Sequence, residues 1–386
     1  MKKKLGIVSC RLFTLSFQQR APLRKRSRLL PLEKRTTESK ITGPHSSPRA
    51  ARFTPMTSTP LAALACALSF LTTVRGAELL PSWNATAPKQ AIVAFVDKVT
   101  REGSPDFVKP EERIATFDND NTLWVEQPNY TQVTFAIDEV VAMAPQHPEW
   151  RQAEPFKSIL AHDREAMLKF SIQDFEKVVA VSHSVMTVQQ FQEIVKKWLA
   201  EAKHSRFKRP YTECIYQPMI ELMQYLRANG FKTCIVTGGG QEFVRAFAGQ
   251  TYGVPSDQVV GSMGKVRYQY DKDGNPELIK LPEVLLIDDK TGKPEGTNMV
   301  IGRRPQAAFG NSTGDQQMLE YTGAGNGARL MMLVHHDDAK REYADGAESK
   351  IGTFSGALMA EAKKKGWIVI SMKDDWKTLF PSAGTE

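Results

Sequence analysis

The sequence has few cysteines and no long apolar run. Only four of its 386 residues are cysteines, and of these only Cys214 and Cys234 lie outside the N-terminal region. Cys234 falls in a predicted strand, where a buried free thiol is the commoner role, so we expect no disulfide. No segment reaches the roughly 18–20 consecutive apolar residues of a membrane-spanning helix. The composition, 41% hydrophobic and 24% charged, excludes bulk disorder, collagen and coiled coil.

The excess of positive charge is confined to the first part of the chain. The formal net charge is +8, and residues 1–55 hold 14 of the 51 Lys and Arg residues but only 2 of the 43 Asp and Glu residues. Residues 56–386 therefore hold 37 basic and 41 acidic residues. No basic patch with interleaved aromatic residues stands out there, so we expect no nucleic-acid partner.

The N-terminal region reads as an arm followed by an export signal. Residues 1–55 lack a sustained apolar period, which predicts a basic, disordered extension, or a start-site artefact if Met56 is the true start. A short apolar run at 61–71 leads to small residues ending at Ala77, which is the layout of a signal peptide over 56–77. We predict an exported protein, periplasmic or secreted. Lipid attachment at Cys66 is the weaker alternative, because the apolar run continues past it.

From about residue 110, short apolar segments recur, each followed by polar or glycine-rich residues. Such strands, separated by helical stretches, predict an α/β fold with a doubly wound parallel sheet. The site of such a sheet lies beyond the carboxyl ends of its strands, where the clusters at 118–122, 237–240 and 310–315 would converge. The predicted strands are 113–117, 233–237, 306–309, 330–334 and 367–370.

The long block between the first two clusters reads mainly as helix, and it is too long for a simple crossover. We therefore expect part of it to form a separate cap, with Thr187 and Gln190 resembling a capping box and Gly230 ending a helix. A second insertion, at 261–285, reads as a β-hairpin with a Gly-containing turn. Examples of the helices predicted in this block are 130–143, 156–170, 187–202 and 218–229.

Asp118 and Asp120 directly follow the first predicted strand, in the run Asp118-Asn119-Asp120-Asn121-Thr122. Two carboxylates can converge at a strand end if the backbone curls, and they repel each other unless a cation neutralises them. A hard divalent ion such as Mg²⁺ is the natural partner. A solvated acidic loop is an equally good reading of this motif alone.

Three further clusters strengthen the first. Thr237 opens a glycine run before a predicted helix at 241–248, where a hydroxyl and free backbone N–H groups make an anion site. Lys293 can present its ammonium group where another helix begins, and the loop 310–319 supplies a carboxylate and an amide. Taken singly, these are a strand–helix turn, a surface lysine and a capped loop.

In this order, the four motifs resemble those of the haloacid dehalogenase-like (HAD) hydrolase superfamily, and the helical block resembles the cap of its phosphoserine-phosphatase-like members. The resemblance spans about residues 110–320. It implies a Rossmann-like core at 78–122 and 231–386, a mainly helical cap at 123–230 and a small hairpin insertion. It also implies a Mg²⁺-dependent phosphomonoester hydrolase that acts through an aspartyl-phosphate on a small phosphorylated metabolite.

The resemblance assigns catalytic roles to individual residues. Asp118 matches the nucleophile. Asp120 matches the general acid and base, which the dehalogenases of the superfamily lack. Lys293 matches the lysine that steadies negative charge and phosphate, although Lys290 lies close enough to compete.

Phosphate and metal ligands are implied in the same way. Thr237 and Gly238 match the phosphate-binding segment. The last motif of the family usually reads Gly-Asp-x-x-x-Asp, but Asn311 replaces its first aspartate here, which removes a negative charge and leaves Asn311 or Asp315 as the direct metal ligand. Asn121 also replaces a usual glycine. The implied Mg²⁺ ligands are Asp118, the backbone carbonyl of Asp120, Asn311 and Asp315.

Other polar residues are weaker candidates. Glu126 and Gln127 follow the nucleophile loop and are candidates for substrate contact, or else hinge residues. His183 and Arg206 in the predicted cap are less favoured. The run His-His-Asp-Asp at 335–338 looks like metal-ligand material, but neighbours on an extended chain point to opposite faces, so we interpret it as a polar loop.

Two alternative functions stay open. An alcohol could replace water in the second step, which would make the protein a phosphotransferase. A catalytically weakened phosphate-ester-binding protein is the other alternative, suggested by Asn311. The expected partner in each case is a small phosphorylated substrate, and the oligomeric state is left open.

We predict that the mature protein starts close to Ala77, because small residues follow the apolar run there. N-terminal sequencing of the exported protein should find this start. A mature form that keeps residues 1–55 would contradict the prediction.

Overall fold

The computed structural model describes residues 78–345 and 353–382. The predicted N-terminal arm and export signal lie outside these residues. Among the helices that are described, no span is both long and apolar enough to cross a bilayer. Cys214 and Cys234 are both buried free thiols.

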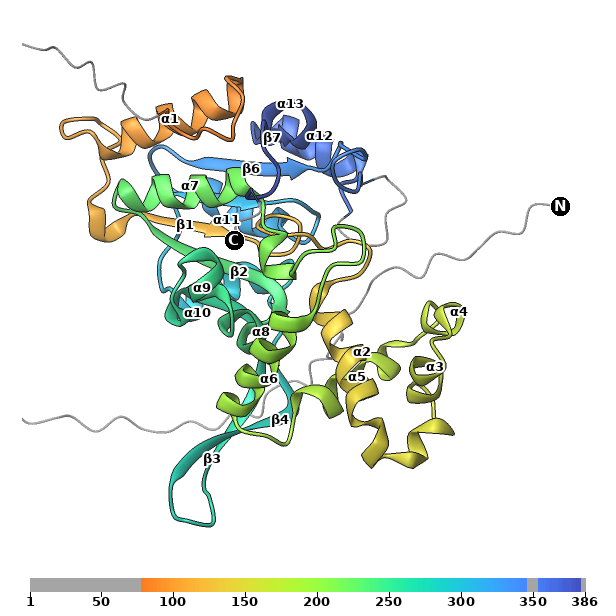
Figure 1. The fold of residues 1–386 in the computed structure, drawn as a ribbon. Coiled ribbons are helices and arrows are strands. Elements are labelled where there is room, and N and C mark those ends of the chain that lie inside the picture. Colours follow the sequence, from red (N-terminus) through yellow and green to blue (C-terminus); the bar gives the residue numbers. More distant parts are fainter. Residues whose placement is uncertain (1–77, 346–352, 383–386) are drawn as a thin grey trace, which may run out of the picture. The chain divides into compact units, whose positions relative to one another are not determined.

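A seven-stranded sheet forms the centre of the fold, in the order β4-β3-β2-β1-β5-β6-β7 (Figure 1). Neighbouring strands run parallel, except for the antiparallel pair β3 and β4. The predicted α/β class with a Rossmann-like, mostly parallel sheet is therefore confirmed. The strands are β1 (Ile114–Phe117), β2 (Lys232–Gly240), β3 (Val259–Tyr270), β4 (Pro276–Leu286), β5 (Ala307–Gly310), β6 (Leu330–His335) and β7 (Ile368–Ser371).

The register of the central strands aligns their carboxyl ends. Phe117, the last residue of β1, pairs with Ile235 of β2 and with Phe309 of β5. The Phe117 and Phe309 rings stack with centroids 4.5 Å apart, and Asp118 N donates to Phe309 O at 2.9 Å. The segments that follow these three strands consequently meet at one edge of the sheet.

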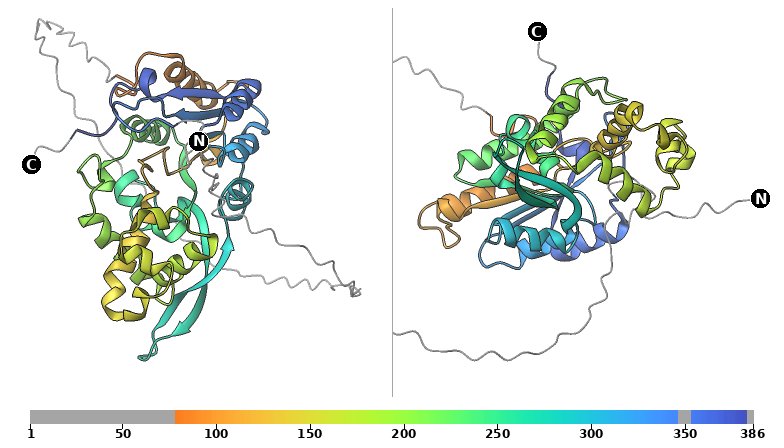
Figure 2. Two further views of the ribbon diagram at one scale, coloured as in Figure 1. Left: turned by 90° about the vertical axis from the view of Figure 1, so that its right-hand side faces the viewer. Right: turned by 90° about the horizontal axis from the view of Figure 1, so that it is seen from below.

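Helices cover both faces of the sheet, because side chains alternate between the faces of each strand. Ile235 and Val259 face a cluster that includes helix α1, whereas Val236 and Val260 face a second cluster with α11 and α12. Figure 2 shows helices on either side of the strands. The helices of this core are α1 (Ala87–Thr100), α7 (Gln217–Ala228), α8 (Gln241–Arg245), α9 (Ala248–Tyr252), α10 (Gly292–Val300), α11 (Gln316–Gly323), α12 (Gly356–Lys365) and α13 (Met372–Asp375).

The helices between β1 and α7 form what we call the cap. Part of the cap has an apolar cluster of its own, which includes Val140, Trp150 and Val178, whereas α7 packs against the sheet through residues such as Leu222. The cap helices are α2 (Thr131–Met143), α3 (Phe156–Leu160), α4 (Arg164–Met167), α5 (Ile172–His183) and α6 (Val188–Glu201).

Local signals in the sequence account for several helix ends. Thr187 and Gln190 form the predicted capping box at the start of α6, and Gly230 follows α7 with φ +79°, a conformation that glycine adopts without strain. One continuous helix over 156–170 is wrong. The Asp163 side chain accepts a hydrogen bond from Ala166 N and starts a separate helix, α4, at Arg164. The predicted helix 241–248 is likewise shorter, because α8 ends at Arg245.

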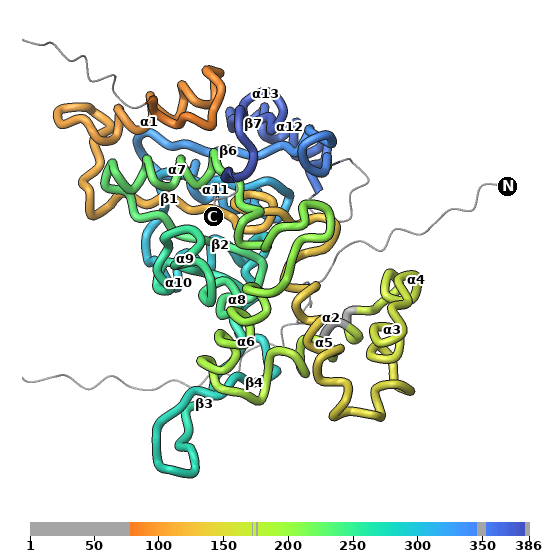
Figure 3. The backbone as a smooth tube through the Cα atoms, viewed as in Figure 1, coloured from red at the N-terminus to blue at the C-terminus, as the bar shows by residue number. Residues whose placement is uncertain are grey.

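The predicted hairpin is an extension of the core sheet. The first residues of β3 pair with β2, and the later ones, from Met263 on, pair with β4. The tube in Figure 3 follows β3 from the core strands into this hairpin. Its far end is exposed, with Tyr268 and Tyr270 at 59% and 64% exposure.

Candidate active site

Lys293 lies at the centre of the converging segments. It stands in the first turn of α10 and is 2% exposed. Its Nζ donates to Asp118 Oδ1 at 2.5 Å, to Asp315 Oδ1 at 2.6 Å and to the carbonyl of Val236 at 2.9 Å. The competing Lys290 is exposed, so the structure brings Lys293 to the predicted nucleophile.

The charges of this cluster depend on one another. Burial, followed by the neighbouring Asp315 carboxylate, raises the pKa of Asp118, and Lys293 opposes that rise. Burial alone would lower the pKa of Lys293, but Asp118 and Asp315 raise it above its ordinary value. We assign Lys293 as an ammonium ion, because two carboxylates within 2.6 Å favour its charged form.

Asp315 is held by its own loop. Its Oδ2 accepts hydrogen bonds from the backbone N–H groups of Asn311 at 2.9 Å and Ser312 at 3.0 Å. A Cβ at Gly310 would lie 2.4 Å from the Cβ of Asp315, so only glycine permits this approach. With Oδ1 on Lys293 and Oδ2 on the backbone, Asp315 has both oxygens engaged.

Asp120 is half-buried, and its two oxygens differ. Oδ1 accepts a hydrogen bond from Trp124 Nε1 at 2.8 Å. Burial is the main cause that raises the pKa of Asp120, and the Trp124 bond opposes it. A carboxyl group with a raised pKa is suited to donate a proton and then to accept one.

Asn121 curls the backbone at the end of β1, as the acidic motif requires. Its φ is +58°, a left-handed conformation that asparagine tolerates better than most residues, which explains how it replaces glycine. Its Oδ1 accepts from Tyr216 OH at 3.0 Å, and its Nδ2 donates to Asp345 Oδ2 at 3.0 Å. His336 Nε2 lies 2.7 Å from its carbonyl oxygen and must donate to it.

His336 is therefore a structural support that the polar-loop interpretation of 335–338 missed. Its ring is fully buried, and Nδ1 lies 3.1 Å from Glu342 Oε2. Burial lowers the pKa of His336, but the Glu342 carboxylate outweighs it, and the net direction is upward. The buried imidazole, paired with Glu342, thus anchors the carbonyl of Asn121, three residues after Asp118.

The glycine turn after Thr237 is less open than its sequence indicates. Thr237 is buried, and its Oγ1 accepts from Gly239 N at 3.1 Å. Gly240 N donates to Oε1 of Gln132, a cap residue, at 2.8 Å. The expectation of free backbone N–H groups is thus wrong for Gly239 and Gly240.

Asn311 lies between the nucleophile and the acid/base loop. One terminal atom of its amide is 3.2 Å from Asp118 Oδ2, 3.1 Å from the carbonyl oxygen of Asp120 and 3.1 Å from Thr122 Oγ1. With nitrogen in that place, the amide donates hydrogen bonds. With oxygen there, it accepts a hydrogen bond from Thr122 Oγ1. It then also lies beside the oxygens of Asp118 and Asp120, and a cation would stabilise these three oxygens together.

The predicted substrate residues flank this centre. Glu126 is 2% exposed, and its Oε1 has no hydrogen-bond partner within the described chain. Burial, with help from Asp120 and Asp345, raises the pKa of Glu126 well above its ordinary value. The carbonyl of Gln127 accepts from His204 Nε2 at 2.7 Å.

The two weaker cap candidates behave differently. His183 lies 3.0 Å from Gln132 and so reaches the glycine turn indirectly. Arg206 donates to the carbonyls of Ala339 and Glu342 and lies over the ring of Tyr343. Arg206 thus braces the loop after β6.

Asp288 is a buried carboxyl that the sequence reasoning missed. It is 0% exposed, and neither of its oxygens has a partner among the residues described. Burial raises its pKa to about 8. A Cβ at Gly296 would lie 2.2 Å from its Oδ1, so the first turns of α10 must approach it closely.

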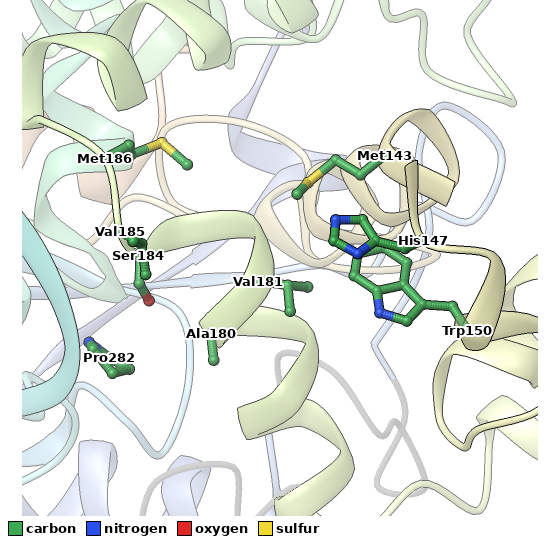
Figure 4. A pocket seen from close by; sticks show the side chains of 9 residues that line it. All are labelled: Met143, His147, Trp150, Ala180, Val181, Ser184, Val185, Met186 and Pro282. Atoms are coloured by element: carbon green, nitrogen blue, oxygen red, sulfur yellow. The ribbon is translucent and has the colours of Figure 1, made fainter. Parts of the chain in front are cut away.

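A separate cavity of about 490 Å³ opens between α5 and β4 (Figure 4). The side chains that line it are mostly apolar and include His147, Trp150 and Val185. The four sequence motifs contribute no residue to this lining. The cavity therefore does not belong to the candidate active site.

The fold brings a carboxylate pair and a lysine together at the carboxyl edge of a parallel sheet. The family model described as haloacid dehalogenase-like hydrolase matches residues 115–320. The chain belongs to this family. The expected family, the fold class and the assignment as a phosphatase-like hydrolase are confirmed at this level.

Solved structures give more distant similarities, and curated proteins give no match. A conserved protein of unknown function from Anaerococcus prevotii is 15% identical, over 77% of this chain and 96% of the other, with a TM-score of 0.49. A phosphoserine phosphohydrolase-like protein from Francisella tularensis is 18% identical, over 64% and 98%, with a TM-score of 0.34. These TM-scores are too low to support an argument about substrate.

Replacing Lys293 with methionine should strand two buried carboxylates. We expect Lys293→Met to lower the free energy of unfolding by about 3–5 kcal/mol, the usual effect of removing one partner of a buried ion pair. Without the cation, the folded-state pKa of Asp118 should lie still further above its unfolded value, so the variant should lose stability as pH rises.

Urea unfolding at pH 5 and pH 8 measures both effects. Lys290→Met is the matched control, because Lys290 is an exposed lysine three residues away. Equal stability losses in the two variants would contradict the central position of Lys293.

Proposed function

We propose that the protein is a Mg²⁺-dependent phosphomonoester hydrolase that acts through an aspartyl-phosphate on Asp118. The observation that carries this proposal is that the two oxygens of Asp118 have different neighbours. Oδ1 is held by Lys293 at 2.5 Å, and Oδ2 lies 3.2 Å from the amide of Asn311. The carboxylate is thus oriented by a cation on one side and by a potential metal place on the other.

Lys293 offsets the repulsion between a carboxylate nucleophile and a phosphate dianion. Thr237, whose buried hydroxyl faces the same glycine turn as Asp120, is the proposed phosphate contact together with Gly238. Covalent catalysis then divides hydrolysis into two steps, transfer of the phosphoryl group to Asp118 and attack by water.

Asp120 supplies the proton chemistry in this proposal. Trp124 holds its Oδ1, so Oδ2 is the oxygen available to protonate the leaving group and later to deprotonate water. Its raised pKa supports a protonated form in the first step. The aspartate at this position also distinguishes the chain from the dehalogenases of the superfamily, which lack it.

The residues around Asn311 fit a Mg²⁺ ion. Neighbouring oxygens of an octahedral Mg²⁺ site with bonds of about 2.0–2.1 Å lie about 2.9 Å apart. The Asn311 amide lies 3.1 Å from the Asp120 carbonyl and 3.2 Å from Asp118 Oδ2, which is close to that spacing. Asn311 is therefore the proposed direct ligand, and Asp315, with both oxygens engaged, is proposed to act through Lys293. A bound Mg²⁺ would reduce the repulsion between the carboxylate and the phosphate.

We expect Asp118→Asn to abolish phosphate release from p-nitrophenyl phosphate with Mg²⁺, and no phosphorylated protein should form, because an amide is a poor nucleophile. Asp120→Asn should also lose turnover, yet phosphoenzyme should accumulate with this good leaving group. Phosphate release and intact-protein mass after acid quenching measure the two effects. Asp97→Asn, an exposed change on α1, is the control, and full activity in Asp118→Asn rules out the nucleophile assignment.

The affinity for Mg²⁺ tests the ligand assignment. Asn311→Asp should tighten binding about tenfold or more, because a carboxylate adds a net charge at the ion, whereas Asn311→Ala should weaken it. Turnover need not rise in Asn311→Asp, since the added charge also repels phosphate. Calorimetric titration of Mg²⁺ compares these variants with Thr313→Ala, a change two residues along the same loop. Equal affinity in all of them would remove this loop from the metal site.

A further inference from the structure

A chain of hydrogen bonds runs from helix α5 of the cap to the glycine turn after β2. Ser182 Oγ donates to Val178 O at 2.7 Å, and His183 Nδ1 lies 2.7 Å from the same hydroxyl oxygen. His183 Nε2 lies 3.0 Å from Gln132 Nε2. Gln132 Oε1 then accepts from Gly240 N at 2.8 Å. The chain crosses from α5 through α2 to the core.

The direction of every bond in this chain can be assigned. The hydrogen of the Ser182 hydroxyl is used on Val178, so its oxygen accepts from His183, and Nδ1 carries the ring proton. Nε2 of His183 is then an acceptor, which turns the amide nitrogen of Gln132 toward it and the amide oxygen toward Gly240. Burial, with a smaller contribution from Lys280, lowers the pKa of His183 to about 3, so the ring stays neutral near neutral pH.

Gln132 also borders the place where the substrate would react. A Cβ built on Gly239 would lie 3.4 Å from Gln132 Oε1, 3.4 Å from Thr237 Oγ1 and 3.6 Å from Asp120 Oδ2. Oε1 of the Gln132 amide thus lies in the same neighbourhood as Thr237 Oγ1, the proposed phosphate contact, and Oδ2 of Asp120, the proposed acid/base. Its second N–H has no acceptor among the described residues.

We propose that Gln132 is a substrate-contacting residue that donates its second N–H to an oxygen of the phosphate ester on the leaving-group side. The inference rests on the proposed phosphomonoester hydrolase function. His183 is a positioning residue in this scheme, because it acts only by fixing the Gln132 amide. A neutral donor suits the place, since a carboxylate there would repel the phosphate.

Steady-state kinetics with p-nitrophenyl phosphate and glycerol 2-phosphate test the contact. Gln132→Leu should lower kcat/KM about 10- to 100-fold on both esters, the loss expected for a hydrogen bond to a charged group. The fall in kcat should be larger for glycerol 2-phosphate, whose poorer leaving group depends more on a donor at its oxygen. The matched control is Gln173→Leu, an exposed glutamine of α5.

A second variant displaces the amide without altering Gln132. A Cβ at Gly240 would lie 2.7 Å from Gln132 Nε2, and Gly240 has φ −66°, which alanine adopts without strain. Gly240→Ala should therefore reproduce the kinetic loss of Gln132→Leu. Wild-type kinetics in both variants, with only a lower melting temperature, would make Gln132 a strut between cap and core and would overturn the proposal.

His183→Phe tests the positioning role, because phenylalanine keeps the ring packing on Phe135 and Phe191. Its kinetic loss should be smaller than that of Gln132→Leu, and the double variant should lose no more than Gln132→Leu alone. Nitrogen-15 NMR of the wild type should show His183 protonated at Nδ1 and unprotonated at Nε2 from pH 5 to 8. Additive losses, or a protonated Nε2, would overturn the role of His183.

Ester kinetics and titration with inorganic phosphate together distinguish a failure of the Gln132 contact from a failure of the proposed hydrolase function. If the wild type hydrolyses both esters and Gln132→Leu hydrolyses them with the same kcat/KM, the proposed function stands and the proposed Gln132 contact is overturned. If the wild type hydrolyses neither ester, the proposed function fails. Calorimetry with phosphate and Mg²⁺ then decides the contact, because weaker binding in Gln132→Leu than in Gln173→Leu supports it and equal binding overturns it.

Discussion

The arrangement of the site depends on one buried ammonium group. Lys293 holds Asp118 and Asp315 at 2.5 and 2.6 Å in a place where it is itself 2% exposed. Two carboxylates in such surroundings repel each other, and their common cation keeps both in place. Because Lys293 binds only one oxygen of Asp118, the other is left facing Asn311. The same contact therefore orders the nucleophile and shapes the proposed metal place.

The sheet brings these groups together by its register. β1, β2 and β5 are adjacent and parallel, and Phe117 is level with both Ile235 and Phe309. The residues after each strand consequently arrive at one edge, although they are far apart in sequence. Gly310 then lets Asp315 approach within a distance that a Cβ would prevent.

Much of this arrangement could be predicted from the sequence. Parallel strands are buried on both faces, so they read as short apolar runs, and the polar residues that follow them mark one edge of the sheet. That rule identified the segments of Asp118, Thr237 and Asp315. The sequence narrowed the choice of the catalytic lysine only to Lys290 or Lys293, because the fold of the helix decides which ammonium group points inward.

The roles of other residues could not be predicted from the sequence, because these roles arise from contacts between segments that are far apart along the chain. His336 bonds to the carbonyl of Asn121, 215 positions away, and Gln132 bonds to Gly240, 108 positions away. In the sequence Trp124 is one more apolar residue, and only the structure shows that its Nε1 donates a hydrogen bond to Asp120. The break at Asp163 did carry a signal, since aspartate is a favoured residue at the start of a helix, and helical periodicity alone concealed it.

The balance of charge explains why an asparagine suits position 311. Burial raises the pKa values of Asp118, Asp120, Glu126 and Asp288, so the surroundings of the nucleophile already resist negative charge. A further carboxylate beside Asp118 would strengthen the attraction for a cation, but it would also add to the charge that an incoming phosphate dianion must meet. An amide still offers an oxygen to the proposed metal ion and omits that charge. In the proposed mechanism, Asn311 therefore binds the metal more weakly than an aspartate would, and it repels the phosphate substrate less.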